Sequence, residues 1–354
     1  MTIVFAIDSF KGSLDSLAAG EAAARGARRV FPDAECVVRP LADGGEGTVD
    51  ALTAGLGGEL CTVTVRGPLG EPVVAKYGLV GEMAVMEMAQ AAGITLVPRE
   101  RLDPLRASTY GVGEMILDAV RRGAKKFIMG IGGSATNDGG RGMLEALGLL
   151  GGGPRRLEPD AFEFRIACDV KNPLCGPDGA SAVFGPQKGA TPAMVTELDA
   201  RLAAFAAASG DPGVTPGDGA AGGLGYALRV YLKARLLPGV ELILAETKLE
   251  GAIRAADVVV TGEGRLDGQS VMGKAPIGVA ELAKKHGKPV LAFCGVTGDG
   301  VEAVNAAGID AYFPILRRVD TLEAALDVRN AAANLTAAAE QAFRCFNLRT
   351  SEGR

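Results

Sequence analysis

Residues 1–30 read MTIVFAIDSFKGSLDSLAAGEAAARGARRV and begin the chain with a strand pattern followed by a helix pattern. The apolar run Thr2–Ile7 has the composition of a buried strand, and the alanine-rich segment Ser16–Val30 has helical periodicity. A second strand near Glu35–Pro40 and a second helix after Gly47 continue the pattern. This alternation predicts an α/β domain.

The same alternation returns toward the other end of the chain. We expect, in order, a strand, helix, strand, helix and strand at Asp257–Thr261, Pro276–Lys285, Val290–Cys294, Val301–Ala307 and Ala311–Pro314. Asp320 is expected to cap a long closing helix, with Glu323 three residues later completing a capping box. Both chain ends are therefore predicted to form one Rossmann-like domain with a parallel sheet.

The middle of the chain has a different pattern. Strand-like runs at Leu60–Arg66, Val73–Val80 and Met83–Met88 are joined by the short turns GPLG and GE, which predict antiparallel hairpins. We therefore predict a second, mixed α/β domain inserted into the first. The approximate limits are 1–60 and 285–354 for the Rossmann-like domain and 61–284 for the inserted domain. Glycine-rich sequence at 151–159 and 210–219 predicts flexible loops.

The composition excludes several classes of protein. With 37 lysine and arginine residues against 42 aspartate and glutamate residues, the formal net charge is −5, which argues against nucleic-acid binding. No apolar stretch reaches the roughly 20 residues of a membrane-spanning helix, and Asp8 and Lys11 come too early for a secretory signal. The six cysteines lack CxxC spacing, as is typical of reduced thiols. We therefore expect a soluble, cytoplasmic protein that binds neither nucleic acid nor membrane.

Histidine occurs once, at His286, in a polar segment expected at a helix end. A single imidazole excludes every mechanism that needs two histidines and leaves little room for a zinc site. Acid–base and metal chemistry must then fall mainly to carboxylates and lysines, and oxygen ligands favour Mg²⁺. This composition points toward phosphoryl transfer.

Five glycine-rich segments carry polar residues after apolar runs, where ligands bind in open α/β sheets. In the first, Asp8–Ser13, a lysine could reach a phosphate or carboxylate beside a helix N-terminus, but the Walker A order is missing. In the second, Leu41–Thr48, acids between glycines could hold a cation or orient hydroxyls. An ordinary strand–helix turn and an aspartate-capped helix are the alternatives. The candidate residues are Lys11, Asp43, Gly44 and Gly45.

The third segment, Gly130–Gly140, follows an expected short strand at Lys126–Met129. Its small residues expose successive backbone N–H groups that can bind an anion. The segment therefore predicts a phosphate- or substrate-binding loop. The candidate residues are Gly132, Gly133, Ser134 and Asn137.

The fourth segment, Ala167–Leu174, ends an apolar run with Asp169, and Phe184–Thr191 follows with Lys188. Burial would raise the pKa of Asp169, whereas a nearby cation would lower it, so both directions stay open. Asp169 could equally cap a turn before Pro173.

The fifth segment, Val260–Gln269 with Gly273–Pro276, holds two acids and two cations after an expected buried strand. That combination suits a clamp for a metal ion and phosphates. A salt-bridged surface loop is the alternative. The candidate residues are Glu263, Arg265, Asp267 and Lys274.

Taken in order, these segments resemble the bacterial type-1 glycerate kinase family almost from end to end. The motifs that carry the resemblance are DSFKGSL, PLADGGEGTVDAL, GIGGSATNDGG, ACDVKNPLCGPDGASAVFGPQKGAT, AAGGLG and VVTGEGRLDGQSVMGKAPIGVA. The resemblance implies a two-domain α/β fold, one domain inserted in the other, with a catalytic cleft between them and ATP-dependent phosphorylation of D-glycerate. It implies cleft positions for Lys11, Asp43, Ser134, Asn137, Asp138, Asp169, Lys188, Glu263, Arg265, Asp267 and Lys274. The segment Leu150–Phe164 is shorter than its counterpart in the family.

Within that resemblance we expect Asp169 to orient or deprotonate a glycerate hydroxyl. Asp267 and Glu263 are expected to hold Mg²⁺ directly or through water. The cations Lys11, Lys188, Lys274 and Arg265 are the candidates for binding phosphates and the glycerate carboxylate. Lys11, Asp267 and Lys274 join Asp169 as predicted catalytic residues.

The resemblance favours the 2-hydroxyl as the acceptor, giving 2-phosphoglycerate, with 3-phosphoglycerate as the alternative. A nicotinamide-dependent oxidoreductase is a rival, but the first strand–helix turn lacks Gly-x-Gly-x-x-Gly. A non-catalytic sugar-acid or phosphate-binding protein is a second rival, disfavoured by the many carboxylates. The expected partners are D-glycerate and ATP, and the oligomeric state stays open.

Overall fold

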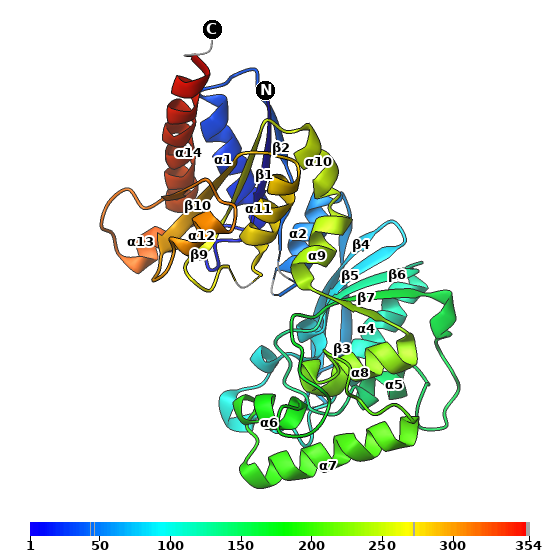
Figure 1. The fold of residues 1–354 in the computed structure, drawn as a ribbon. Helices are drawn as coiled ribbons and strands as arrows, with labels where there is room; N and C mark the ends of the chain where they lie inside the picture. Colours follow the sequence, from blue (N-terminus) through cyan, green and yellow to red (C-terminus); the bar gives the residue numbers. More distant parts are fainter. Residues whose placement is uncertain (43, 46, 272, 352–354) are drawn as a thin grey trace. The chain divides into compact units, whose positions relative to one another are not determined.

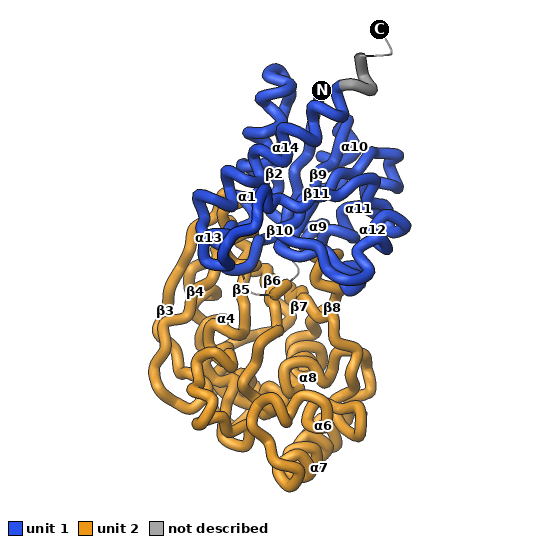
Figure 2. Tube along the Cα trace, turned by 90° about the vertical axis from the view of Figure 1, so that its left-hand side faces the viewer, with its two compact units in different colours: residues 1–43, 243–354 blue, residues 44–242 orange. Residues whose placement is uncertain are grey.

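The computed structural model describes residues 1–42, 44, 45, 47–271 and 273–351, with side chains described through residue 347. The chain divides into two compact units, coloured separately in Figure 2. Unit 1 comprises residues 1–43 and 243–354, and unit 2 comprises residues 44–242. The expected α/β fold with one unit inserted in the other is confirmed.

The junctions lie at 43/44 and 242/243, earlier in the chain than the predicted 60/61 and 284/285. Two packing arrangements explain the difference. Strand β9 (Val258–Leu266) pairs in parallel with β1 (Thr2–Ile7), so the segment 243–284, predicted to lie in the inserted domain, belongs to unit 1. Helix α2 (Thr48–Gly55) packs on β4 (Pro72–Val80), where a Cβ at Gly78 would lie 1.7 Å from Thr53 Oγ1, so α2 belongs to unit 2.

Unit 1 is built on a five-stranded parallel sheet with the order β11-β10-β9-β1-β2. Its other strands are β2 (Glu35–Val38), β10 (Val290–Thr297) and β11 (Ala311–Pro314). Its helices are α1 (Ser16–Arg28), α10 (Leu249–Ala255), α11 (Ala275–Lys285), α12 (Ala303–Ala306), α13 (Leu322–Leu326) and α14 (Val328–Ser351). Helix α9 (Gly239–Glu246) contains the second junction.

The first and last long helices of unit 1 cover one face of this sheet. Figure 1 shows α1 and α14 side by side, and a Cβ at Gly26 would lie 2.3 Å from Thr336 O, so glycine permits that close approach. Beneath them, Ile3 and Phe5 of β1 are fully buried with Phe343 of α14. Strand β1 is buried on both faces from Ile3 to Ile7, and the face that carries Ile3 and Phe5 joins both chain ends in one core.

The closing segment differs from the expected single helix capped by Asp320. Thr321 caps α13 instead, accepting a hydrogen bond from Ala324 N at 3.2 Å. Asp327 then separates α13 from α14, and its Oδ1 accepts from Arg329 N and Asn330 N at 3.0 Å. The capping side chain at Asp327 ends one helix and starts the next.

Unit 2 is built on a six-stranded sheet with the order β3-β4-β5-β6-β7-β8. The expected hairpins are confirmed, because β3–β4 and β4–β5 pair antiparallel while β5 to β8 pair in parallel. Its other strands are β3 (Glu59–Arg66), β5 (Met83–Glu87), β6 (Lys126–Gly130), β7 (Glu163–Ala167) and β8 (Arg235–Leu237). Its other helices are α3 (Ala89–Ala92), α4 (Tyr110–Arg121), α5 (Arg141–Ala146), α6 (Ala180–Phe184), α7 (Pro192–Ser209) and α8 (Ala220–Leu232).

Two general features bear on the expectations above. All six cysteines are free thiols. Among the described residues, no helix is both long and apolar enough to cross a membrane.

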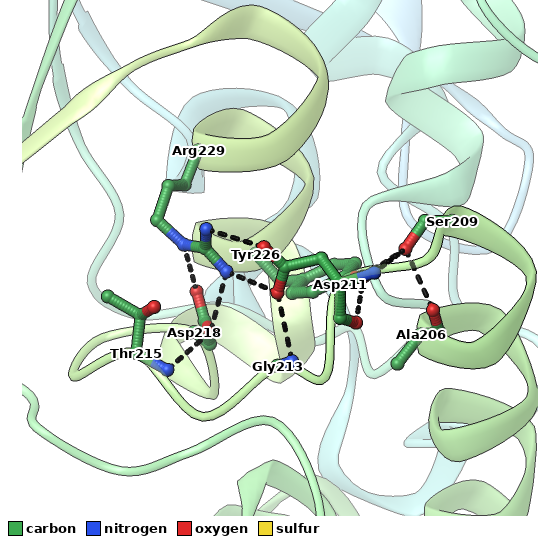
Figure 3. A network of polar contacts seen from close by, with 8 residues as sticks. All are labelled: Ala206, Ser209, Asp211, Gly213, Thr215, Asp218, Tyr226 and Arg229. Carbon is green, nitrogen blue, oxygen red and sulfur yellow. Dashed lines mark hydrogen bonds and ion pairs between the residues drawn. The ribbon is translucent and has the colours of Figure 1, made fainter.

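The loop at 210–219, expected to be flexible, is held by a charged network shown in Figure 3. Arg229 donates to both oxygens of Asp211 at 2.8 and 2.9 Å and to both oxygens of Asp218 at 2.7 and 2.9 Å. Asp218 is fully buried, and its Oδ2 also accepts from Thr215 N. Paired bidentate bonds of this kind fix the loop geometry.

Replacing Arg229 with methionine is expected to lower the free energy of unfolding by about 3–5 kcal/mol, because Asp218 would be left buried without its cation. Urea unfolding followed by circular dichroism measures the loss. Arg155→Met is the control, since its ion pair with Glu158 is exposed and is worth less than about 1 kcal/mol. Equal losses in the two variants would contradict a special role for the buried network.

Candidate functional site

The first and fifth glycine-rich segments meet in unit 1. Strands β1 and β9 are parallel neighbours, and the chain leaves β1 toward β2 on one side and β9 toward β10 on the other. Ligands bind at such a switch point, outside the carboxyl ends of the strands. A cavity of about 400 Å³ lies here, lined in part by Lys11, Glu263, Arg265 and Lys274. The structure thus brings these four predicted residues together.

Two acids in this group share one lysine. Lys274 Nζ lies 3.6 Å from Glu263 Oε2 and 4.0 Å from Asp267 Oδ1, and Arg265 Nε lies 3.1 Å from Asp267 Oδ2. Ser270 Oγ donates to Glu263 Oε1 at 2.6 Å. Burial raises the pKa of Glu263, and the neighbouring Ser270 and Lys274 act in the opposite direction. Both carboxylates are therefore largely buried, which a salt-bridged surface loop would not produce. Arg265, in contrast, is exposed.

Glu263 and Arg265 were expected in a loop after the strand, but the structure places them elsewhere. Strand β9 extends to Leu266, so Glu263 and Arg265 lie inside it. The strand continues because β10 pairs with it as far as Leu266. Glu263 is consequently held by a hydrogen-bonded backbone rather than by a turn.

The donor set of unit 1 bears on the expected metal ion. Within the described part of the chain, no three His, Cys, Asp or Glu side chains are grouped closely enough to hold a metal by themselves. Mg²⁺, however, is commonly held by one or two carboxylates, with waters and substrate phosphates completing its shell. The neighbouring carboxylates of Glu263 and Asp267 fit that pattern.

Parts of the second, third and fourth segments meet in unit 2, at the carboxyl ends of β6 and β7. A Cβ at Gly44 would lie 2.6 Å from Ala167 Cβ, and a Cβ at Gly130 would lie 2.3 Å from Gly44 O. Glycine therefore permits close backbone contact among these three segments. Two residues beyond Ala167, Asp169 Oδ1 accepts a hydrogen bond from Gly239 N at 3.0 Å.

The remaining candidate residues of the second segment are Gly45 and Asp43. Gly45 O accepts hydrogen bonds from Thr48 N at 3.3 Å and Thr48 Oγ1 at 2.7 Å, at the start of α2. Asp43 lies outside the described residues. Its expected contact with a ligand therefore stays a prediction.

The glycine-rich loop after β6 is held by a buried lysine. Lys188 is only 2% exposed, and its Nζ donates to Ser134 Oγ at 2.7 Å and to Thr136 O at 2.6 Å. Burial lowers the pKa of Lys188 to about 7. Asn137 Nδ2 donates to Ser181 Oγ at 2.9 Å, while Thr136 Oγ1 and Asn137 Oδ1 are buried without a hydrogen-bond partner among the described residues. The loop therefore combines a titratable cation with unsatisfied polar atoms.

The lowered pKa of Lys188 predicts that the free energy of unfolding depends on pH. Its folded pKa lies below the ordinary value of 10.5, so as the pH falls from about 10 to 7 the unfolded chain takes up the proton first. Keeping Lys188 deprotonated in the folded chain therefore costs more free energy as the pH falls, and the free energy of unfolding decreases. Compared with Lys188→Met, the wild-type free energy of unfolding should rise between pH 7 and pH 9 by up to about 1 kcal/mol per pH unit.

Urea unfolding at pH 7, 8 and 9 measures this difference. Lys233→Met is the control, because the ion pair of Lys233 with Asp160 is exposed. The wild type and this control should respond to pH in parallel. A Lys188→Met variant that also responded in parallel with the wild type would show that Lys188 titrates at its ordinary value.

The other predicted residues of this loop make hydrogen bonds mainly with backbone groups. Asp138 Oδ2 accepts from Thr109 N and Thr109 Oγ1 at 2.8 Å, and its Oδ1 accepts from Gly140 N at 3.0 Å. Its carboxylate is thus used within the protein, before α5. Gly133 O accepts from Ile94 N, and space is open where a Cβ of Gly132 would point.

One buried acid in unit 2 has no place in the sequence-based prediction. Glu87 ends β5, opposite Gly130 in the sheet register, and is 5% exposed. Its Oε1 accepts from Val49 N at 3.0 Å near the start of α2, and burial raises its pKa. A single acid closing an apolar strand is the only signal for it in the sequence.

A second feature with no assigned role is the support that the AAGGLG motif gives to the loop. Ala221, Gly222 and Gly223 all have positive φ, and Gly222 O accepts from Gly139 N at 2.9 Å. A Cβ at Gly222 would lie 2.1 Å from Thr136 O. The glycine is therefore required by both its conformation and its neighbour.

Comparisons with known proteins agree over most of the chain. Residues 3–151 and 153–347 match the sequence model of the glycerate kinase family. The chain is 47% identical to the glycerate kinase of Halalkalibacterium halodurans and 46% identical to the glycerate 2-kinase of Escherichia coli, in each case covering 92% of this chain and 93% of the relative. A crystal structure assigned as glycerate kinase 2 from Salmonella typhimurium LT2 is 41% identical, with a TM-score of 0.90 and 99% of both chains covered. The matched residues include both units.

Proposed function

Because the chain belongs to the glycerate kinase family and is therefore an enzyme, we propose that it transfers the terminal phosphoryl group of ATP to D-glycerate. The observation that carries the proposal is the group of Lys11, Glu263, Arg265 and Lys274 around one cavity at the switch point of the parallel sheet. Phosphoryl transfer depends mainly on positioning and on neutralising negative charge. Cations beside buried carboxylates supply both.

Asp169 is the proposed residue for activating the acceptor hydroxyl. It follows β7, and only its Oδ1 has a described hydrogen bond, from Gly239 N. A carboxylate held through one oxygen can orient a hydroxyl, or accept its proton, through the other. Lys11, Lys274 and Arg265 are proposed to bind the phosphates or the glycerate carboxylate, and Arg265 would bind the carboxylate bidentately.

Glu263 and Asp267 are the proposed holders of Mg²⁺. Their neighbouring carboxylates suit an ion that keeps water and phosphate ligands, and the raised pKa of Glu263 would fall when a cation binds nearby. Bound there, Mg²⁺ would neutralise phosphate charge. In unit 2, the backbone N–H groups of residues 132–140 are proposed to bind an anion, with Ser134 and Lys188 shaping the loop.

The 2-hydroxyl is the proposed acceptor, so the product would be 2-phosphoglycerate. Support comes from the relative in Escherichia coli that is named glycerate 2-kinase. Phosphorus–proton coupling in the NMR spectrum of the product distinguishes the two isomers. Coupling to the C3 methylene protons instead of the C2 proton would identify 3-phosphoglycerate and overturn the assignment.

A coupled assay tests the activity itself. Purified protein with Mg-ATP should release ADP only when D-glycerate is added. NAD reduction without ATP would instead identify an oxidoreductase, and glycerate binding without turnover would identify a sugar-acid sensor. A variant in which both Glu263 and Lys274 are substituted, purified in the same way, controls for contaminating kinases.

A further inference from the structure

The cavity of unit 1 has a second, apolar side to which the roles above assign nothing. Besides its charged residues, it is lined by side chains from the end of β10, from the segments that follow β1 and β11, and from α13. The large apolar residues of this wall are Phe10, Val296, Ile315, Leu316, Leu322 and Leu326. The cavity therefore joins an apolar wall to a charged end.

Much of the apolar wall is open to solvent in unit 1. Leu322 is 76% exposed, Val296 42%, Leu326 38% and Leu316 37%. Isolated exposed leucines need no explanation, but several around one cavity mark a surface that a ligand covers. The wall would accept a flat apolar group.

The polar end of the cavity contains a hydroxyl group and a cation that have no partner among the described residues. Ser13 lines it, and the Oγ of Ser13 is buried without a hydrogen-bond partner among the described residues. Lys11 is exposed and makes no ion pair within the described part of the chain. An anionic group with acceptor oxygens would satisfy both side chains.

We propose that this cavity binds the nucleoside triphosphate, with its base against the wall of Phe10, Leu316 and Leu326 and its phosphates toward Lys11 and Lys274. The proposal rests on the kinase function and assigns the nucleotide to unit 1. An amphipathic cavity at the switch point matches a ligand with an aromatic end and a polyanionic end. The six apolar side chains of the wall carry no amide or hydroxyl group, so they contribute shape and apolar contact to recognition of the base.

Binding of Mg-ADP, measured by titration calorimetry without glycerate, tests the site. Leu326→Asp should raise the Kd about tenfold or more, because a carboxylate replaces an apolar contact and repels the phosphates. Leu322→Asp provides a second variant, since an acid at the first position of α13 is compatible with its N-terminus. Val328→Asp is the matched control, being 54% exposed and outside the cavity, and should change the Kd less than twofold. Unchanged Mg-ADP affinity in both leucine variants would overturn the proposal.

This measurement separates the site from the activity. If glycerate-dependent turnover were absent but the leucine variants still lost Mg-ADP binding, the kinase assignment would fail and the nucleotide site would stand. Photolabelling with 8-azido-ATP gives an independent map, with label expected on peptides from residues 315–331. Label confined to unit 2 would place the base elsewhere and overturn the proposal.

The apolar wall also predicts weak base selectivity. ATP and GTP should differ by less than about 100-fold in kcat/KM, since an apolar pocket cannot discriminate by the 10⁴–10⁵-fold typical of sites that hydrogen-bond their substrate. Discrimination of that larger size would contradict recognition by apolar contact.

Discussion

Asp169→Asn is expected to lower the turnover number for D-glycerate phosphorylation about 10²–10⁴-fold, the scale of a positioned acid–base group. The amide keeps the size of the side chain and can still accept the hydrogen bond that Oδ1 receives from Gly239 N. It cannot take a proton from a substrate hydroxyl. Steady-state kinetics with saturating Mg-ATP and D-glycerate measures the change.

Folding and specificity need a control for this prediction. The thermal midpoint of Asp169→Asn should stay within a few degrees of the wild type, because its one described hydrogen bond is retained. Asp178→Asn changes an exposed acid that lies later in the same loop region, and it should leave turnover unchanged. Near-normal turnover in Asp169→Asn would instead move the proposed base to Asp267 or Asp43.

The sheet elements were the part of the fold most accessible from sequence. Thr2–Ile7 and Ala311–Pro314 coincide with β1 and β11, because apolar runs between turn residues mark buried strands. The short turns before and after Pro72–Val80 were equally informative, since only hairpins can connect strands so closely. Local patterns of this kind need no knowledge of distant contacts.

The unit junctions could not be read in the same way. Whether α2 belongs with β1 or β4 depends on the fit of Thr53 against Gly78, two residues 25 positions apart. The length of β9 likewise depends on pairing with β10, which extends the strand through the polar residues Glu263 and Arg265. Tertiary pairing overrides the local pattern in both cases.

For the candidate site, glycine-flanked acids and lysines identified the segments but not the use of each side chain. Lys188 was a predicted phosphate ligand, yet its Nζ is bonded to Ser134 and Thr136 within a buried loop. Glu87 was not predicted, because burial depends on neighbours from α2 and β6 that the strand pattern does not specify. Burial and partner choice are properties of the folded chain.

Lys274→Met is expected to lower kcat/KM for Mg-ATP on the order of 10²–10³-fold, the usual cost of removing one group that stabilises developing charge. Lys274 Nζ lies 3.6 Å from Glu263 Oε2 and 4.0 Å from Asp267 Oδ1, so the substitution also leaves two acids without their shared cation. Since Lys274 lowers the pKa of Glu263 against the effect of burial, its loss should raise that pKa and move the acid limb of the pH–rate profile to higher pH.

The division of the Lys274→Met effect between kcat and KM identifies the step in which this lysine acts. A rise in KM alone would assign it to ground-state binding, and an equal fall in kcat and kcat/KM would assign it to the transition state. Lys284→Met is the matched control, because Lys284 has the same 38% side-chain exposure and pairs with Asp310 away from the cavity. If both variants kept wild-type kinetics and the same acid limb, the charged cluster around Glu263 would have no part in phosphoryl transfer.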